Sequence, residues 1–326
     1  MLSRLATLGM AALSLLPFVA RPAAAQAFPD RPIRIIVPIN PGGGTDIFAR
    51  TLQEIVGNSL GQPIIVENRP GASGTIGVQY VIDSRPDGHT LGFIWNTPVT
   101  AAPHTLGARY TIDQMAPVFT IGYSPFTLCA RPDFPARSLP DMIADVRAHP
   151  GTYTWGNEGL GGVMHLGVER ILRRLNLDMT TVPFQGAGQT LPAFLGGHIT
   201  FYGGSIVGAM PAIRANSARC LLLTTREGHP AAPDGAGLDS LGLGDMAVTI
   251  WWGMIAPVGI PADRMARLNE AFGAAMRTPR FREAMDAQGA TLAPVFGEEM
   301  GRAMRAEYEA LGEVARTLGL SRQPAR

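Results

Sequence analysis

A run of glycines followed by short polar residues is the first feature of this sequence that could do chemistry. Gly42, Gly43 and Gly44 are followed directly by Thr45 and Asp46. Because no Cβ stands in the way, the backbone of such a loop can approach a ligand closely. The first N–H groups of a helix that begins at Thr45 would lack intrahelical partners, and the helix dipole is positive there. The loop therefore predicts an anion site, and a tight turn before a capped helix is the plainer alternative.

Further loops bring similar residue types to the ends of predicted strands. One contains Ser73, one begins with Asn96 and Thr97, and one runs from Asn157 and Glu158 through several glycines. Residues 185–188 form another glycine-rich loop after a predicted strand. A strand, a glycine loop and a helix start thus occur in the same order in both halves of the chain, and we expect the loops to face each other across a cleft.

Several familiar chemistries are disfavoured by what the sequence lacks. It contains no lysine, which excludes a Walker-type phosphate loop and Schiff-base or pyridoxal chemistry. The glycine spacing misses G-x-G-x-x-G, so a dinucleotide site is disfavoured. The six histidines and two cysteines show no metal-ligand spacing, and G-x-S-x-G is absent. We expect no cofactor, no metal and no catalysis.

Alternating strands and helices must position these loops. Residues 33–37 form a short β-branched run typical of a strand buried on both faces, and residues 64–66 and 90–95 continue the pattern. Helices are predicted from Thr45 and over 77–84. This rhythm predicts a parallel sheet with helices on both faces, in which ligands bind beyond the carboxyl ends of the strands.

A second sheet is predicted further along the chain. Val118–Arg131 indicates a strand pair that crosses to it, and Ser138 caps a helix over 139–149. Its remaining predicted elements are strands at 152–155, 181–184, 199–202 and 220–224 and helices at 163–175 and from 188 through 195. Residues 251–257 predict a strand that returns to the first sheet, and 300–318 an amphipathic helix. We predict one lobe from 26–122 plus 250–326 and a second from 123–249, facing each other across a cleft.

The composition and the N-terminal segment limit the classes of protein to which this chain can belong. The chain has 326 residues, of which 46% are hydrophobic and 16% charged, as expected for two globular lobes. Its net charge of +1 gives no reason to expect nucleic acid as a partner. Arg4, the apolar run from Leu5 and the small residues before Gln26 predict a cleavable signal peptide over 1–25. We therefore expect a periplasmic monomer, with an uncleaved anchor as the alternative.

The two cysteines leave two interpretations open. In an oxidising periplasm Cys129 and Cys220 could form a disulfide. Two isolated cysteines in apolar strands are also typical of small buried side chains, and the sequence does not give their separation.

Four segments taken together resemble the tripartite tricarboxylate transporter substrate-binding proteins, the Bug or TctC-like family. They are FPDRPIRIIVPINPGGGTDIFAR, VENRPGASGTIGV, RPDGHTLGF and VPFQGAGQTLPAFLGGHITF. The resemblance runs from Phe28 nearly to the C-terminus. It implies an α/β fold of the type II periplasmic binding protein class, in which two lobes close over a small solute, typically a carboxylate. It also implies a membrane permease as partner, to which the solute is delivered.

In that family backbone N–H groups and short polar side chains of the facing loops hold the ligand. The corresponding positions are Gly43, Gly44, Thr45, Asp46, Ser73, Asn96 and Thr97 in the first lobe and Asn157, Gly161, Gly162, His165, Gly186, Gly204 and Ser205 in the second. For Asp46 we expect a role in ordering the loop, because it would repel a carboxylate. His165 either donates to the ligand or bonds a nearby loop carbonyl.

Three residues depart from the family's usual pattern. Asn40 stands where a small residue or proline is usual, and Gly162 where serine or threonine is common. Glu158 places an acid in a loop expected to receive an anion. A Glu158 carboxylate pointing into the cleft would repel a ligand carboxylate by about 2 kcal/mol and disfavour a tricarboxylate. The alternative is that Glu158 faces solvent.

The function that follows is an extracytoplasmic solute receptor that delivers a small carboxylate to a tripartite tricarboxylate-type transporter. A periplasmic sensor that docks on a receptor kinase would use the same fold and stays open as an alternative. A periplasmic enzyme is a third, disfavoured one, because no catalytic set can be assembled from the sequence.

Overall fold

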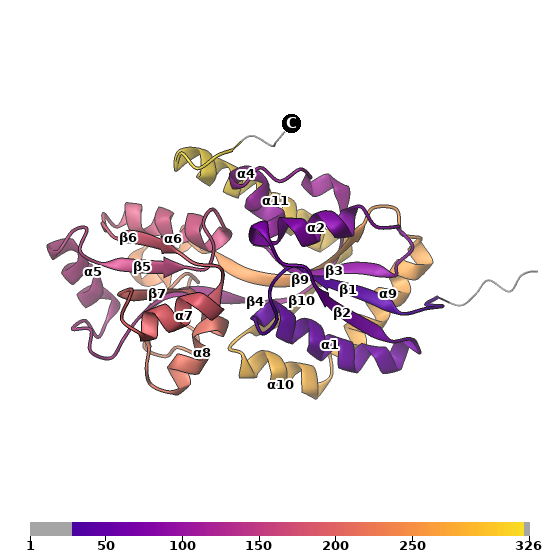
Figure 1. The fold of residues 1–326 in the computed structure, drawn as a ribbon. Coiled ribbons are helices and arrows are strands. Elements are labelled where there is room, and N and C mark those ends of the chain that lie inside the picture. Colours follow the sequence, from indigo (N-terminus) through magenta and orange to yellow (C-terminus); the bar gives the residue numbers. More distant parts are fainter. Residues whose placement is uncertain (1–27, 323–326) are drawn as a thin grey trace, which may run out of the picture.

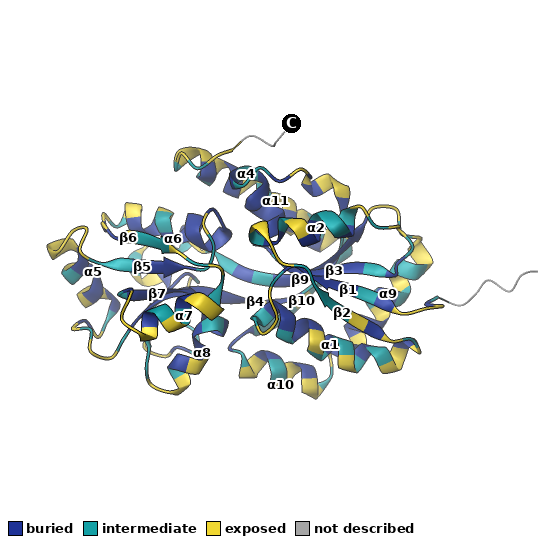
Figure 2. Cartoon of the chain, viewed as in Figure 1, coloured by how far each residue is buried: buried dark blue, intermediate teal, exposed yellow. Residues whose placement is uncertain are grey.

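The computed structural model describes residues 28–322, and the predicted signal segment at 1–25 lies outside that range. Figure 1 shows two α/β lobes joined by the long strands β4 (Met115–Ala130) and β9 (Thr249–Pro257). Figure 2 shows that buried residues line the strands of both lobes, with exposed residues on the outer faces of the helices. The apolar core therefore follows the sheets and continues from one lobe into the other.

The sheet of the first lobe begins with three parallel strands in the order β2-β1-β3. They are β1 (Ile33–Val37), β2 (Ile64–Asn68) and β3 (Thr90–Trp95), and β3 continues the sheet by pairing antiparallel with β9. Ile35, Ile36 and Val37 are fully buried, which confirms the prediction of a strand covered on both faces.

Helices cover both faces of this sheet. On one face α2 (Thr75–Ile82) and α11 (Gly297–Thr317) pack through Val78, Val81, Met300 and Met304. On the other lie α1 (Gly44–Leu60) and α9 (Ala262–Met276), with α10 (Pro279–Ala287) beside α1. Short helices α3 (Thr97–Thr100) and α4 (Ala102–Thr105) follow β3. The predicted apolar face of the C-terminal helix is thereby confirmed.

The second lobe repeats the arrangement on a smaller scale. Its strands β5 (Thr154–Asn157), β6 (Thr180–Pro183) and β7 (Phe201–Ser205) are parallel, with β5 in the middle. Strand β8 (Arg219–Leu223) pairs with β4. Its helices are α5 (Leu139–Ala148), α6 (Val163–Arg174), α7 (Ala187–Leu195) and α8 (Ile206–Arg214). Each strand from β5 to β7 leads through a loop or directly into a helix, so the loop ends gather at one edge.

Strand β4 is one strand of 16 residues rather than the predicted strand pair over Val118–Arg131. Up to Pro125 it pairs with β9, and from Phe126 onward with β7 and β8. At Gly122, with φ +150°, the absence of a side chain allows the backbone of Thr291 on β10 (Thr291–Phe296) to approach closely while the strand continues. The chain crosses between the sheets where predicted, but it does so as one continuous strand and not as a strand pair.

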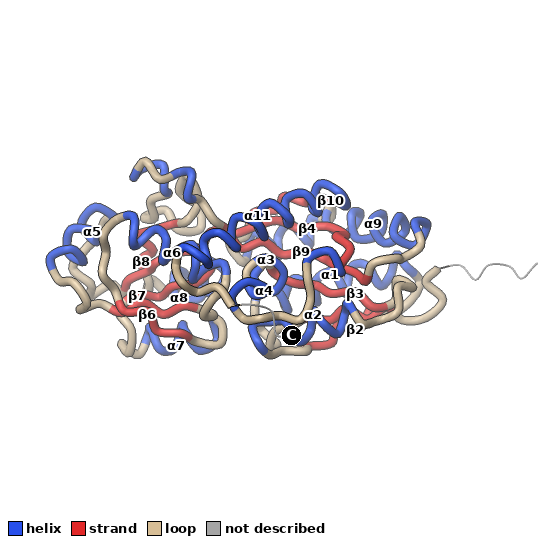
Figure 3. The backbone as a smooth tube through the Cα atoms, turned by 90° about the horizontal axis from the view of Figure 1, so that it is seen from above, coloured by secondary structure: helices blue, strands red, loops and turns tan. Residues whose placement is uncertain are grey.

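Two further features complete the frame. Cys129 and Cys220 form a disulfide between β4 and β8, which settles the question that the sequence left open. Figure 3 shows α11 lying along the junction of the lobes, where it contacts α3 and α4 of the first lobe and α6 of the second. Within residues 28–322 no helix has the length and apolar character needed to span a membrane.

Candidate functional site

The glycine loop after β1 leads into α1 without a capping side chain. Gly43 is the N-cap of α1 in an extended conformation, with φ −79° and ψ 164°. Its neighbour Gly42, at φ +90°, is the residue whose backbone conformation favours glycine. Because Gly43 has no side chain to accept their hydrogen bonds, the first N–H groups of α1 stay available at the carboxyl end of β1.

Asp46 orders this loop from the third position of the helix rather than from the cap. Its buried carboxylate accepts hydrogen bonds from the backbone N–H of Gly42 at 3.0 Å, Nε of Arg50 at 3.0 Å and Nδ2 of Asn68 at 2.8 Å. Burial by itself would raise the pKa of Asp46, but these three donors outweigh it and hold the pKa below its usual value. Asp46 therefore stays ionised and satisfied by the chain itself.

The start of α1 meets the second lobe at the start of α8. A Cβ at Gly44 would lie only 2.8 Å from Cγ1 of Val207. One residue further on, a Cβ at Gly208 would lie 2.8 Å from Cβ of Ala187, next to Gly186, which is the N-cap of α7. Gly159 approaches Ser73, with 3.8 Å between a Cβ at Gly159 and the Ser73 hydroxyl.

These contacts bring together the predicted residues Gly43, Gly44, Thr45, Asp46, Ser73, Glu158, Gly186, Gly204 and Ser205, which we call the α1–α8 cluster. Three helices from two lobes thus begin around one place.

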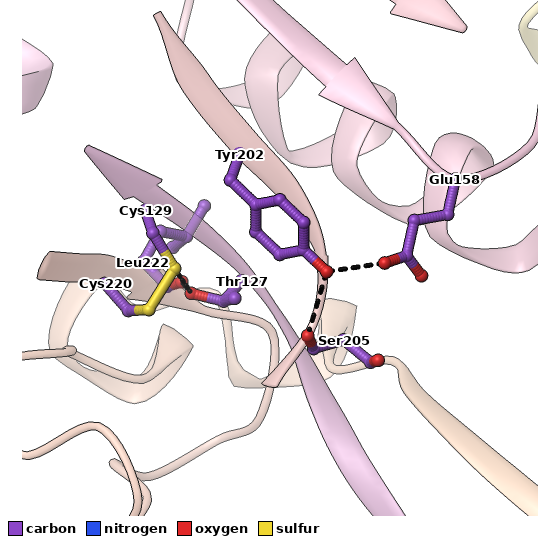
Figure 4. The surroundings of a disulfide bond; sticks show 7 residues. All are labelled: Thr127, Cys129, Glu158, Tyr202, Ser205, Cys220 and Leu222. Atoms are coloured by element: carbon purple, nitrogen blue, oxygen red, sulfur yellow. Dashed lines mark hydrogen bonds between the residues drawn. A yellow bond between two sulfur atoms is a disulfide. The ribbon is translucent and has the colours of Figure 1, made fainter. Parts of the chain in front are cut away.

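Glu158 neither faces solvent freely nor stands alone in the cleft. Figure 4 shows its carboxylate beside Tyr202, whose hydroxyl donates to Oε1 at 2.5 Å. Burial raises the pKa of Glu158 to about 7, against the opposing effect of the Tyr202 hydroxyl and the Ser205 N–H. Oε1 lies 2.4 Å from where a Cβ at Gly204 would be and 2.8 Å from one at Gly208. The two glycines therefore make room for the carboxylate at the start of α8.

The other predicted residues form a second group, nearer to α11. The Thr97 hydroxyl accepts from the N–H of Val163, the first residue of α6, at 3.2 Å. The Thr105 hydroxyl donates to the carbonyl of Gly161 at 2.8 Å. Both hydrogen bonds run from the first lobe to the second. We call Asn96, Thr97, Asn157, Gly161, Gly162 and His165 the α3–α6 group.

Two members of the α3–α6 group are engaged by the chain itself. Asn96 is buried, and its Nδ2 donates to the carbonyl of Thr249 and to Oε1 of Glu307. Nδ1 of His165 accepts from the N–H of Gly161, and its ring stacks on Trp155. Burial lowers the pKa of His165, so the imidazole is neutral at pH 7. Neither residue is placed as a free donor to a ligand.

Asn96 and Asn157 each have one buried amide atom without a partner among the described residues, an acceptor (Oδ1) in Asn96 and a donor (Nδ2) in Asn157. The other half of the Asn157 amide, Oδ1, accepts from the N–H of Gly159 at 2.8 Å. A buried donor without a partner is uncommon, and a ligand or water would satisfy it.

Sequence reasoning missed Tyr202, Thr105 and Val207. Tyr202 alone carried a signal: it stands two residues before Gly204 in a strand, so the two share a face. In residues 28–322 no group of three or more His, Cys, Asp or Glu side chains is arranged to hold a metal ion.

The sequence matches a known protein family. The family model described as Tripartite tricarboxylate transporter family receptor matches residues 48–319. The chain belongs to this receptor family. Among its relatives, a UPF0065 protein of Bordetella pertussis is 32% identical over 99% of this chain and 98% of its own length. Protein BugT of the same organism is 32% identical over 84% of this chain and 85% of its own.

Solved structures of similar proteins agree. The periplasmic binding protein BugD has 26% sequence identity and a TM-score of 0.82, with 91% of this chain and 100% of that one covered. MatC from Rhodopseudomonas palustris with bound malate has 30% identity and a TM-score of 0.78 over 88% of this chain and 99% of its own. An R. palustris protein with adipate has 26% identity and a TM-score of 0.81, with 90% of this chain and 98% of that one covered.

The comparisons confirm the predicted family and the two-lobed α/β fold of periplasmic binding proteins. They also mark this as a family of solute-binding receptors, and two of the similar structures contain a carboxylate, malate in one and adipate in the other.

Proposed function

We propose that this chain captures a small carboxylate between its lobes in the periplasm and delivers it to the membrane subunits of a tripartite tricarboxylate transporter. Family membership supports the receptor role. The malate bound to MatC and the adipate bound to the second R. palustris protein support a carboxylate as ligand.

The observation that carries the proposal is the uncapped start of α1 opposite the second lobe. An anion there gains about 0.3–1 kcal/mol from the helix dipole and about 1.5–3 kcal/mol from each charge-assisted hydrogen bond. Three or four such bonds reach the roughly 8 kcal/mol of a micromolar site. A cationic side chain is not required. Arg50, the closest arginine in sequence, already pairs with Asp46.

The proposed mechanism is closure of two bodies, residues 26–122 with 250–326 and residues 123–249. The hydrogen bonds of Thr97 and Thr105 span the gap between them, so a ligand enters when they are broken and is enclosed when they form again. Strand β4 runs through both bodies and β9 begins at their boundary, and the proposed hinge lies in these two strands. We propose a monomer that binds one ligand, exported by the signal peptide at 1–25.

Calorimetry on the mature chain from Gln26 with malate, adipate, succinate and citrate tests this function. Gly43→Val should weaken binding of the best of them at least tenfold, because the side chain blocks approach to the first N–H groups of α1. The backbone of Gly43 suits valine, and its Cβ would lie 3.4 Å from Ile39, an ordinary contact.

The matched control is Gly57→Ala, in the same helix but away from the loop, where a Cβ meets no atom closer than 4.0 Å. It should keep the affinity and raise stability slightly. Unchanged affinity in folded Gly43→Val, or no heat with any carboxylate, would contradict the proposal.

A further inference from the structure

The side chain of Glu158 is held in one position by its neighbours. Its carboxylate lies at the N-terminal end of α8, one of the places where the fold would otherwise receive an anion. The Tyr202 hydroxyl fixes it at 2.5 Å, and Gly204 and Gly208 provide the space that any side chain would fill. The chain has thus placed its own carboxylate on this helix.

The position of this carboxylate relative to α1 matters for a ligand. Val207 contacts Gly44 at the start of α1, and Gly208, the next residue, lies against Glu158. The start of α1 and the Glu158 carboxylate therefore lie against neighbouring residues at the start of α8. A ligand with one carboxylate at α1 would have its other end within reach of Glu158 if it extended along α8.

We propose that Glu158 selects ligands by the charge of the end far from α1: a neutral or hydrogen-donating group is accepted directly, and a second carboxylate only together with one proton. This inference rests on the proposed function, because it names the class of ligand that the same cleft takes. The proton adds to Oε2 of Glu158 while Oε1 keeps the bond from Tyr202. The resulting acid donates to an oxygen of the ligand's second carboxylate, so one buried negative charge remains instead of two.

The surroundings of Glu158 suit this proton uptake. Tyr202, which lies on β7, keeps its proton because burial raises the pKa of its hydroxyl well above the usual value. From the first turn of α6, His165 is neutral at pH 7, and Asp46 of α1 is paired with Arg50. Helix α7 carries no charged residue, and α8 carries only Arg214, in its last turn. With the pKa of Glu158 at about 7, both protonation states are accessible near neutral pH.

Succinate and succinamate are matched probes, because they differ only in a carboxylate against an amide at one end. Wild-type protein should bind succinate about tenfold more weakly at pH 8 than at pH 6.5, and succinamate equally at both. Calorimetry in phosphate and in Tris at pH 8 should show close to one proton taken up with succinate and none with succinamate.

Glu158→Gln should remove the difference in succinate affinity between pH 6.5 and pH 8. The amide oxygen can still accept from Tyr202, succinate binding should become independent of pH over this range, and the affinity at pH 8 should rise about tenfold. Glu227→Gln removes an exposed charge from the same lobe and should behave as wild type. Tyr202→Phe is an independent variant: loss of a bond that favours the charged form should move the midpoint of the succinate profile to higher pH.

Equal pH dependence for the two probes, or a profile that survives Glu158→Gln, would overturn the role of Glu158 and leave the receptor function standing. Failure of all carboxylates, these two included, to bind folded wild-type protein would instead overturn the proposed function.

Discussion

At the scale of single residues, Glu307 is a third carboxylate, after Asp46 and Glu158, that the chain itself engages. It lies on α11, where Oε1 accepts from Asn96 at 2.8 Å and Oε2 from Nε1 of Trp251 at 2.6 Å. Asn96 precedes Thr97 of the α3–α6 group, and Trp251 lies on the connecting strand β9. Glu307 therefore holds a cleft loop and the hinge strand to the same helix.

Removal of this acceptor should be costly. Glu307→Ala leaves one of the two N–H groups of the Asn96 amide and the indole N–H of Trp251 without their acceptor, at about 1–3 kcal/mol each. Urea denaturation should show a loss of about 2–6 kcal/mol at pH 5. Glu309→Ala, an exposed acid on the same helix, is the matched control and should change stability by less than about 0.5 kcal/mol.

The size of the loss should depend on pH. Burial raises the pKa of Glu307 to about 7 in spite of its hydrogen bonds, from 4.5 in the unfolded chain. Between pH 4.5 and pH 7, Glu307 is mostly protonated in the folded protein and mostly ionised in the unfolded chain. Its contribution to stability therefore falls as the pH rises from 4.5 to 7. Glu307→Ala abolishes that fall and should destabilise less at pH 8 than at pH 5. An equal loss at both pH values would mean that Glu307 ionises normally in the fold.

The contacts of such residues also mark what the sequence could not supply. The glycine loops and their polar neighbours were recognisable because local residue types determine them. Glu158 and Tyr202 are 44 residues apart, and Asn96 and Glu307 are 211 apart. No local pattern connects them. The sequence therefore identified the loops of the candidate site, while the partners of their side chains required the fold.

At the scale of elements, local patterns predicted best where local physics decides. The strand over 90–95 and the Ser138 cap appear in the structure as predicted. The strand pair predicted over Val118–Arg131 was wrong, because pairing with β9 and then with β7 and β8 keeps the chain extended as one strand. Strand β10 and helix α9 went unpredicted. Tertiary packing overrides local preference in such segments.

The disulfide acts at this scale, because it connects β4 to β8 across 91 residues of chain. A crosslink of that length removes about 4–5 kcal/mol of unfolded-state entropy in the chain-entropy account. Reduction should therefore lower the free energy of unfolding by about 2–4 kcal/mol, measured by urea denaturation with and without reductant. The double variant Cys129→Ala and Cys220→Ala should be equally destabilised and indifferent to reductant. A wild-type midpoint unaffected by complete reduction would show that strand pairing alone holds β8.

At the scale of the whole molecule, exchange of ligand depends on separation of the lobes. Ser73 and Gly159 come from different lobes, and the Ser73 hydroxyl lies 3.8 Å from where a Cβ at Gly159 would stand. A sulfur in place of this oxygen would need to lie about 3 Å from the other Cβ to form a disulfide, so a closing movement of about 1 Å between the two loops allows the bond. The double variant Ser73→Cys and Gly159→Cys should therefore lock the lobes together when oxidised.

In the locked state a ligand cannot enter, so the association rate of the best carboxylate should fall at least 100-fold, as followed by stopped-flow fluorescence. Oxidation with ligand already bound should instead trap it and slow dissociation by a similar factor. Mild reduction should restore both rates, since the native disulfide is buried and reacts more slowly. Gly159→Cys alone should bind as wild type under either condition. If the locked protein takes up ligand at the wild-type rate, entry does not require the lobes to part, and the hydrogen bonds of Thr97 and Thr105 do not gate the site.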